Sequence, residues 1–302
     1  MRRCAALTLL VAASLTGAWS RGPAPVAAQA GPTIALNVQP PEPHQVATVQ
    51  GLLRAARVRH IRVSWWAWST RASWSWLPAY RAAGVEVLPL VYPTGNGAEN
   101  AGRTMAARYR ALFDAYGPFP YVQLGNEMDG AGPFGIPGSN AYRQGRRWAD
   151  QLREATRLIH QFDPAVRIVA GGMAWVHPGT QDFVRGMVDG GGFDVFAIHI
   201  YGIGCAGEPL GRIQEIRAQG WTGPVWATEL GVDNGQARYI ERNVDAFQAE
   251  QIRRCLAEDP ARLQYDRLYW FQLTPDPAGF GILRPDFSPR PAFDWLRSRS
   301  GG

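Results

Sequence analysis

Residues 121–130, YVQLGNEMDG, have the pattern of a buried strand that ends on polar side chains. Val122 and Leu124 alternate with polar or small residues, and Asn126 and Glu127 follow directly. Alternation of this kind predicts a β-strand. An amide and a carboxylate at its end can simply mark the point where a strand reaches solvent. The rest of the sequence has to decide between this interpretation and a functional one.

Eight strand-like segments alternate with helix-like segments after Gly31, with no linker between them. The clearest helix follows the fourth strand, because apolar residues recur at steps of four and three from Trp148 to Phe162. Strands that alternate with helices predict a parallel sheet with right-handed crossovers. Eight units in about 270 residues predict an α/β fold, a single (β/α)8 TIM barrel domain at 31–302. The expected strands are 33–38, 60–68, 85–92, 121–127, 166–175, 193–201, 224–231 and 267–273.

A doubly wound open sheet is the alternative fold. Residues 202–207, GIGCAG, match the Gly-x-Gly-x-x-Gly of dinucleotide-binding sheets, and Glu229 follows about twenty residues later. The match falls in the sixth unit, and Glu208 and Pro209 delay the next helix, so its first turn starts too late to hold a pyrophosphate. The sequence therefore favours the barrel, and we expect no cofactor.

Residues 1–30 have the features of a secretory signal peptide. Arg2 and Arg3 precede an apolar run that is too short to span a bilayer, and AQA at 28–30 supplies small residues for cleavage. An uncleaved membrane anchor is the alternative. We expect a secreted protein, extracellular or periplasmic, that has no membrane association after cleavage.

Charge and composition exclude several classes of function. Without the three arginines of residues 1–30, the chain keeps 28 arginines against 25 acidic residues, a net charge of +3. A nucleic-acid partner would need a denser basic stripe, so we expect none. The chain contains no lysine, which excludes Schiff-base enzymes, pyridoxal enzymes and Walker-type phosphate loops.

Two cysteines, Cys205 and Cys255, remain after cleavage, because Cys4 leaves with the signal peptide. In an exported chain such a pair invites a disulfide. In a barrel, however, Cys205 follows the exit of a strand, whereas Cys255 lies late in a helix that runs toward the opposite rim. The sequence leaves this pairing open.

The strand ends bring two carboxylates together. In a barrel, catalytic side chains lie at the carboxyl ends of the strands. The fourth strand ends on Asn126 and Glu127, the seventh on Glu229, and the sixth on His199 and Tyr201, which share one face. One carboxyl group can protonate the leaving oxygen of a glycosidic bond while another attacks or activates water. Glu127 and Glu229 are therefore candidate catalytic residues for cleavage of an oligosaccharide or polysaccharide.

Tryptophans surround this expected mouth. Aromatic rings offer apolar faces to the C–H surface of a sugar, and Trp66 and Trp68 at the exit of the second strand are candidates for such a platform. Alternation along the strand puts about half of the tryptophans of 65–76 into the core. Arg62 could instead be a surface arginine, and His199 a satisfied core histidine.

These motifs resemble those of the retaining (β/α)8 glycosidases of glycoside hydrolase clan A, which includes cellulases, β-mannanases, xylosidases and several β-1,3-glucanases. The resemblance spans the chain after residue 30, and its short motifs are LGNE, IHIYG, VWATELG and YWFQL. It implies a two-glutamate double-displacement mechanism, with Glu127 as the acid/base and Glu229 as the nucleophile.

The same resemblance assigns roles to the neighbouring residues. Asn126 would bind the sugar 2-hydroxyl, and Trp270 would form the floor of the subsite beside the cleaved bond. Arg62, His199 and Tyr201 would orient the carboxylates. Met128 stands where many members carry proline, and the third strand lacks the histidine of the cellulase-type families, so the sugar and the linkage stay open.

A secreted glycan-binding barrel without turnover is the main alternative function. A pure binder has no need for two carboxylates in its mouth, so the glutamate pair counts against it. The sequence has no Gly-x-Ser-x-Gly elbow and no His-Glu-x-x-His motif. Its five histidines are scattered, so we expect no metal site, and we expect a monomer.

The signal peptide gives the first testable prediction. We expect cleavage after Ala30, because AQA supplies the small residues that signal peptidases require. Intact-mass measurement of the exported protein should match a chain that starts at Gly31. A mass that still includes Trp19 would contradict this.

Overall fold

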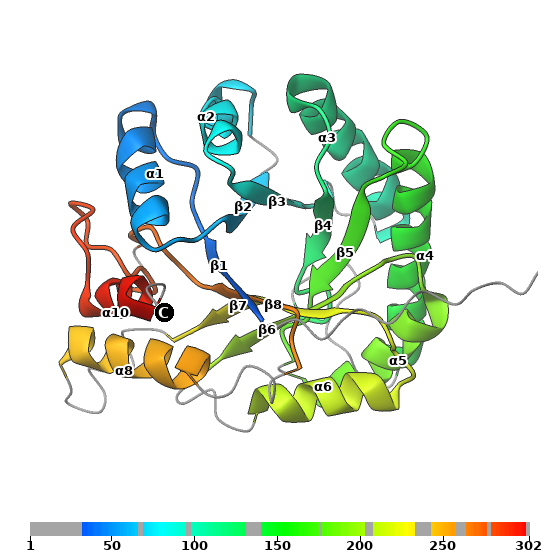
Figure 1. Ribbon diagram of the computed structural model, residues 1–302. Coiled ribbons are helices and arrows are strands. Elements are labelled where there is room, and N and C mark those ends of the chain that lie inside the picture. The colour runs from blue at the N-terminus through cyan, green and yellow to red at the C-terminus, as the bar shows by residue number, and fades with distance from the viewer. Residues whose placement is uncertain are drawn as a thin grey trace, which may run out of the picture. The chain divides into compact units, whose positions relative to one another are not determined.

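Eight parallel strands form one sheet, in the order β5-β4-β3-β2-β1-β8-β7-β6. β1 pairs with both β2 and β8, so the first and last strands of the chain are neighbours. In the computed structural model the strands form the central layer and helices lie outside them (Figure 1). The strands are β1 (Thr33–Asn37), β2 (His60–Trp65), β3 (Glu86–Val91), β4 (Tyr121–Asn126), β5 (Arg167–Gly172), β6 (Phe196–Tyr201), β7 (Val225–Gly231) and β8 (Arg267–Trp270).

The barrel is closed between β5 and β6. Val169 bridges to Val195 and Met173 to Ile198, and the amide of His199 donates to the carbonyl of Met173 over 2.8 Å. The prediction of a (β/α)8 TIM barrel is confirmed. The alternative of an open doubly wound sheet is wrong, so the crevice in which such a sheet binds a dinucleotide does not form. Residues 203–207 of the GIGCAG motif lie outside the described residues.

The helices connect successive strands and cover the barrel (Figure 1). They are α1 (Val46–Ala55), α2 (Leu77–Ala82), α3 (Ala101–Tyr116), α4 (Ala141–Ile159), α5 (Thr180–Gly190), α6 (Glu208–Ala218), α8 (Val244–Ala257) and α10 (Pro291–Arg299), with short 3-10 turns η1 (Pro43–Gln45), η2 (Ala72–Trp74) and η3 (Ala98–Asn100). The apolar stripe of α4 is buried as its spacing predicts, including Trp148, Leu152 and Ile159.

The structure describes residues 32–65, 69–94, 98–130, 140–175, 177–202, 208–232, 243–257, 264–276 and 279–299. Internal contacts make Gly31–Gly302 a single compact unit. Among the described residues, every helix is too short or too polar to cross a bilayer.

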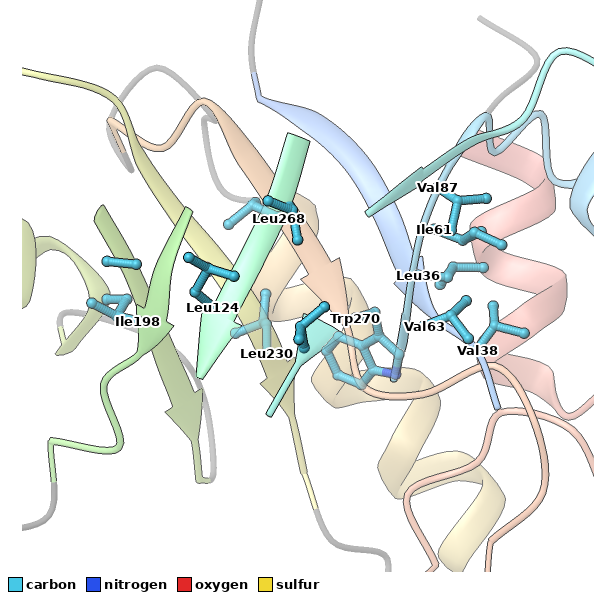
Figure 2. Close-up of a cluster of buried hydrophobic side chains, with 14 of the residues drawn as sticks. Leu36, Val38, Ile61, Val63, Val87, Leu124, Ile198, Leu230, Leu268 and Trp270 are labelled. Carbon is cyan, nitrogen blue, oxygen red and sulfur yellow. The ribbon is translucent and has the colours of Figure 1, made fainter. Parts of the chain in front are cut away.

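Strand alternation divides the core into two layers. Side chains that point into the barrel form a small cluster, with Trp226 and Tyr269 as its largest members. Side chains that point outward pack against the helices, and Figure 2 shows several of them, including Leu36, Leu268 and Trp270. Both faces of a parallel sheet are thereby buried, as such sheets require.

Two strands depart from regular alternation where they reach the mouth. In β4, Gly125 has φ 76°, a left-handed conformation that turns the chain just before Asn126. In β7, the pairing register with both neighbours shifts by one residue after Ala227, so this strand carries an extra residue next to Glu229. A bulge re-aims the side chain beside it, and here it turns Glu229 toward the inside of the barrel.

The kink in β4 yields a prediction about stability. A methyl group on Gly125 would lie 2.8 Å from the ring of Trp148, and a left-handed conformation costs a residue with a Cβ about 1–2 kcal/mol. Gly125→Ala should therefore lower the free energy of unfolding by at least about 1 kcal/mol in urea denaturation. Gly51, on an exposed position of α1 with nothing within 4 Å of an added Cβ, is the matched control. Gly51→Ala should raise the free energy of unfolding by up to about 1 kcal/mol, and equal effects of the two changes would refute the strain at Gly125.

Candidate active site

Glu127 stands at the end of β4 in a left-handed conformation, with φ 50°. Its amide donates to the carbonyl of Gly172 over 2.8 Å, and its carbonyl accepts the amide of Gly130 over 2.9 Å. Its side chain is 37% exposed. Two residues further on, the buried Asp129 accepts the amides of Ala174 and Trp175 over 2.8 and 2.9 Å. The loop after β4 is therefore anchored to the loop after β5, while the Glu127 carboxylate stays open to solvent.

Glu229 on β7 is the more enclosed of the two glutamates, with a side chain only 10% exposed. One of its oxygens accepts a hydrogen bond from the guanidinium of Arg62 over 2.8 Å. The other accepts a hydrogen bond from the hydroxyl of Tyr201. Burial alone raises the pKa of Glu229, but the charges of His199 and Arg62 and the hydrogen bonds from Tyr201 and Arg62 outweigh it and leave the pKa below its ordinary value. Glu229 is therefore held as a carboxylate.

Tyr201 is matched to this role as a donor. Burial, followed by the charge of Glu229 and the hydrogen bond to it, raises the pKa of Tyr201 well above its ordinary value. The phenol therefore keeps its proton and donates it to the carboxylate in a hydrogen bond.

The imidazole of His199 lies between the two glutamates. Its Nδ1 is 2.8 Å from Oε1 of Glu127, and its Nε2 is 3.5 Å from Oε1 of Glu229. The ring is fully buried, and a Cβ at Gly172 would lie 2.1 Å from Nε2. The glycine at the end of β5 therefore provides the space that lets one histidine face both carboxylates.

Arg62 on β2 is buried and connects the acidic strand ends. Its Nη2 donates to Oδ1 of Asn126 over 2.7 Å, and its Nη1 donates to Oδ1 of Asn37 over 2.7 Å as well as to Glu229. Its Nε donates to Oε1 of Gln123 over 2.7 Å. Arg62 is therefore a buried interior residue, and the surface interpretation of it is excluded.

The two carboxylates lie close together. One potential ligand atom each from Glu127, His199 and Glu229 can be chosen so that all three lie within 4.8 Å of one another. Retaining glycosidases hold their carboxyl groups about 5–5.5 Å apart, whereas inverting enzymes need about 6.5–9.5 Å to admit a water. The approach of one oxygen from each glutamate is therefore nearer to the retaining arrangement than to the inverting one.

The same three side chains have the composition of a metal site, which the scattered histidines of the sequence did not indicate. The expectation that the protein has no metal site stays a prediction. The surroundings nevertheless disfavour a cation, because the guanidinium of Arg62 lies 2.8 Å from Glu229 and would repel it. His199 Nδ1 is also already engaged by Glu127.

A pocket of about 200 Å³ opens over the glutamate pair. It is lined by Asn37, Val38, Gln39, Arg62, Ser64, Tyr92, Asn126, Glu127, Glu229, Phe271 and Gln272. Two pockets of about 310 and 330 Å³ lie near the opposite ends of the strands, and both are lined by Arg57 and Arg59. The described residues that line these two pockets include no carboxylate, whereas Glu127 and Glu229 both line the pocket of about 200 Å³.

Trp270 is not among the described residues that line this pocket. Trp270, expected as its floor, is completely buried in the layer outside the barrel (Figure 2). β8 has only four residues, and its alternation turns Tyr269 inward and Trp270 outward, so Phe271 reaches the pocket instead. Trp66 and Trp68 lie outside the described residues.

Several tryptophans and the cysteines can be placed as well. Trp65, Trp74 and Trp76 are core residues, and ring centroids of Trp65 and Trp74 are 5.3 Å apart. Cys255 is buried and disulfide-bonded, while Cys205 lies outside the described residues.

Three further pocket residues, Tyr92, Gln39 and Gln272, were not selected from the sequence. Tyr92 directly follows β3. Burial raises its pKa, the charge of Arg62 lowers it, and the charges of Glu229 and Glu127 raise it. Gln39 and Gln272 come from the segments after β1 and β8. The Nε2 of Gln39 donates a hydrogen bond to Oε1 of Gln272 over 3.1 Å. Their positions directly after strand ends were the available signal.

Comparison with known proteins bears on the fold. No protein-family model matches the chain, and no curated protein matches it significantly. A family 39 glycoside hydrolase from Bacteroides cellulosilyticus superposes with a TM-score of 0.66 at 19% identity, over 89% of this chain and 63% of that one. This chain thus spans less than two thirds of the length of that relative.

Two further solved structures are similar to this chain. A GH128 (subgroup I) endo-β-1,3-glucanase from Amycolatopsis mediterranei, in complex with laminaritriose, superposes with a TM-score of 0.58 at 16% identity, over 89% of this chain and 99% of that one. A monomeric β-xylosidase from Caulobacter crescentus gives a TM-score of 0.61 at 14% identity, over 90% of this chain and 69% of that one. The resemblance to the (β/α)8 glycosidases of clan A is therefore confirmed at the level of the fold.

Proposed function

We propose that this protein is a glycosidase that cleaves a β-linked oligosaccharide or polysaccharide with retention of anomeric configuration. The observation that carries the proposal is the approach of Glu127 and Glu229 within 4.8 Å at the mouth of the barrel. A non-catalytic glycan-binding barrel is not favoured, because a binder gains nothing from a close pair of carboxylates with different environments.

The environments of the two glutamates fit different steps. Glu229 is ionised and held by Arg62 and Tyr201, so its free electron pair attacks the anomeric carbon. Glu127, the more exposed of the pair, gives its proton to the glycosidic oxygen as that bond breaks. Water then donates a proton back to Glu127 while its oxygen displaces Glu229 from the sugar, which regenerates both side chains.

Asn126 and the pocket fit a bound sugar ring. The Oδ1 of Asn126 is taken by Arg62, so its amide nitrogen is the atom that can donate to a hydroxyl of the sugar. Phe271 gives the pocket an apolar wall, and Gln39 and Gln272 add polar groups. These residues would hold the ring while the glutamates act on it.

The substrate class is proposed from the relatives. The GH128 structure carries laminaritriose, and this chain covers 99% of it. The similar β-xylosidase widens the range to xylosides. β-1,3-Glucan oligosaccharides and chromogenic β-glycosides, including β-xylosides, are therefore the first substrates to test.

We also propose secretion and a monomeric state. The disulfide at Cys255 supports export, because disulfides persist in oxidising compartments. The charged start and apolar run of residues 1–30 support the same destination.

Single substitutions separate the two catalytic roles. Glu229→Ala should abolish turnover of all substrates, and added azide should restore some reaction by forming a glycosyl azide of inverted configuration. Glu127→Ala should spare aryl glycosides with a good leaving group, because general acid help is worth about 10²–10⁴ in rate and these need none. Initial rates on both substrate types measure this.

Glu154→Ala is the matched control, since Glu154 lies on the surface of α4 in an ion pair with Arg157. Its activity should equal that of the native enzyme. Proton NMR of the first-formed sugar should show retained configuration. An inverted product, or full activity of Glu229→Ala, would overturn the proposed mechanism.

Activity should not depend on a metal, because Arg62 already neutralises Glu229. Prolonged dialysis against a chelator should leave the hydrolysis rate unchanged within error. Loss of activity that a single divalent metal restores would instead identify Glu127, His199 and Glu229 as ligands.

A further inference from the structure

Arg62 donates to four acceptors among the described residues, and only one of them carries a charge. The carboxylate of Glu229 is the charged one, and the side-chain oxygens of Asn37, Gln123 and Asn126 are neutral. These neutral partners hold the guanidinium whatever the state of Glu229. Asn37 and Asn126 also line the pocket, whereas Gln123 does not.

Gln123 contacts both Arg62 and the irregular end of β4. It is completely buried, and its Oε1 accepts Nε of Arg62 over 2.7 Å. Its Nε2 lies 3.3 Å from the carbonyl of Gly125, the left-handed residue that turns β4 toward Glu127. One amide therefore connects the arginine that binds Glu229 with the kink that presents Glu127.

We propose that Gln123 is a positioning residue that keeps Arg62 in place throughout the catalytic cycle, and this inference rests on the proposed glycosidase function. When Glu229 bonds to the sugar, its negative charge is lost and the ion pair with Arg62 ends. The hydrogen bond from Nε to Gln123 does not change in that step. It keeps the guanidinium at the site where the departing carboxylate must regain its charge.

The groups that face Glu229 define what a change at Gln123 should do. They are Arg62 from β2, Tyr92 after β3, Glu127 after β4, and His199 and Tyr201 from β6. The charge of Arg62 and its hydrogen bond are among the causes that lower the pKa of Glu229. A displaced Arg62 should therefore let that pKa rise, and the acid limb of kcat/KM should move to higher pH.

Two substitutions of Gln123 test the inference. Gln123→Leu removes the acceptor for Arg62, and kcat/KM should fall between about 10- and 100-fold, since a shift of about 1 Å can cost about 10² in rate. Gln123→Glu keeps the acceptor, so it should retain more activity than Gln123→Leu at high pH. Its charge competes for Arg62, so its acid limb should also move to higher pH.

Tyr109→Phe is the control for stability. Tyr109 is buried in α3 and donates to Asp163 over 2.6 Å, away from the site. The change loses one buried hydrogen bond, and it should lower the melting temperature without moving the acid limb. If the Gln123 variants changed kcat/KM and its pH profile no more than Tyr109→Phe does, the positioning role would be refuted.

A second readout does not depend on turnover. Carbon-13 NMR of glutamate carboxyl groups, with Glu229 assigned by its absence in Glu229→Gln, follows the titration of Glu229 directly. The midpoint should rise in both Gln123 variants and stay unchanged in Tyr109→Phe. Unchanged midpoints in the Gln123 variants would overturn this inference even in an active enzyme. A native protein without hydrolase activity would refute the proposed function alone, and the NMR titration would still decide the role of Gln123.

Discussion

The mouth of this barrel is organised around one buried positive charge. Arg62 is almost completely enclosed, and a buried guanidinium is costly unless every donor is matched. Its partners come from β1, β4 and β7. Because the guanidinium is planar and rigid, it fixes the positions of side chains from strands that do not pair with one another.

The two glutamates depend on departures from regular strand geometry. Strict alternation puts successive side chains on opposite faces, which would send Glu229 outward beside Ala227. The extra residue in β7 prevents this. In β4 the left-handed Gly125 and Glu127 have the same effect. Local irregularity at both strand ends thus converts a packed barrel into one that presents two acids to the same pocket.

Much of this arrangement could be predicted from the sequence, because it follows from order along the chain. Eight strand–helix units indicate the barrel, and strand ends meet at one rim, which makes neighbours of Glu127, His199 and Glu229. Which side chains of β8 point into the barrel could not be predicted. A four-residue strand has too few positions to show on which face Trp270 lies. In the sequence, Gln123 is one polar residue in an alternating strand. Its role could not be predicted, because its partner Arg62 belongs to a different strand.

The contact of Trp148 with Gly125 links the outer layer of the molecule to its chemistry. The indole belongs to α4, and its ring occupies the space that any side chain at residue 125 would need. The turn that exposes Glu127 is therefore supported from outside the barrel, whereas Glu229 is held from within by Arg62 and Tyr201. A molecule in which α4 has locally detached would keep Glu229 in place and lose the position of Glu127. The relative position of the two glutamates consequently depends on the docking of a single helix.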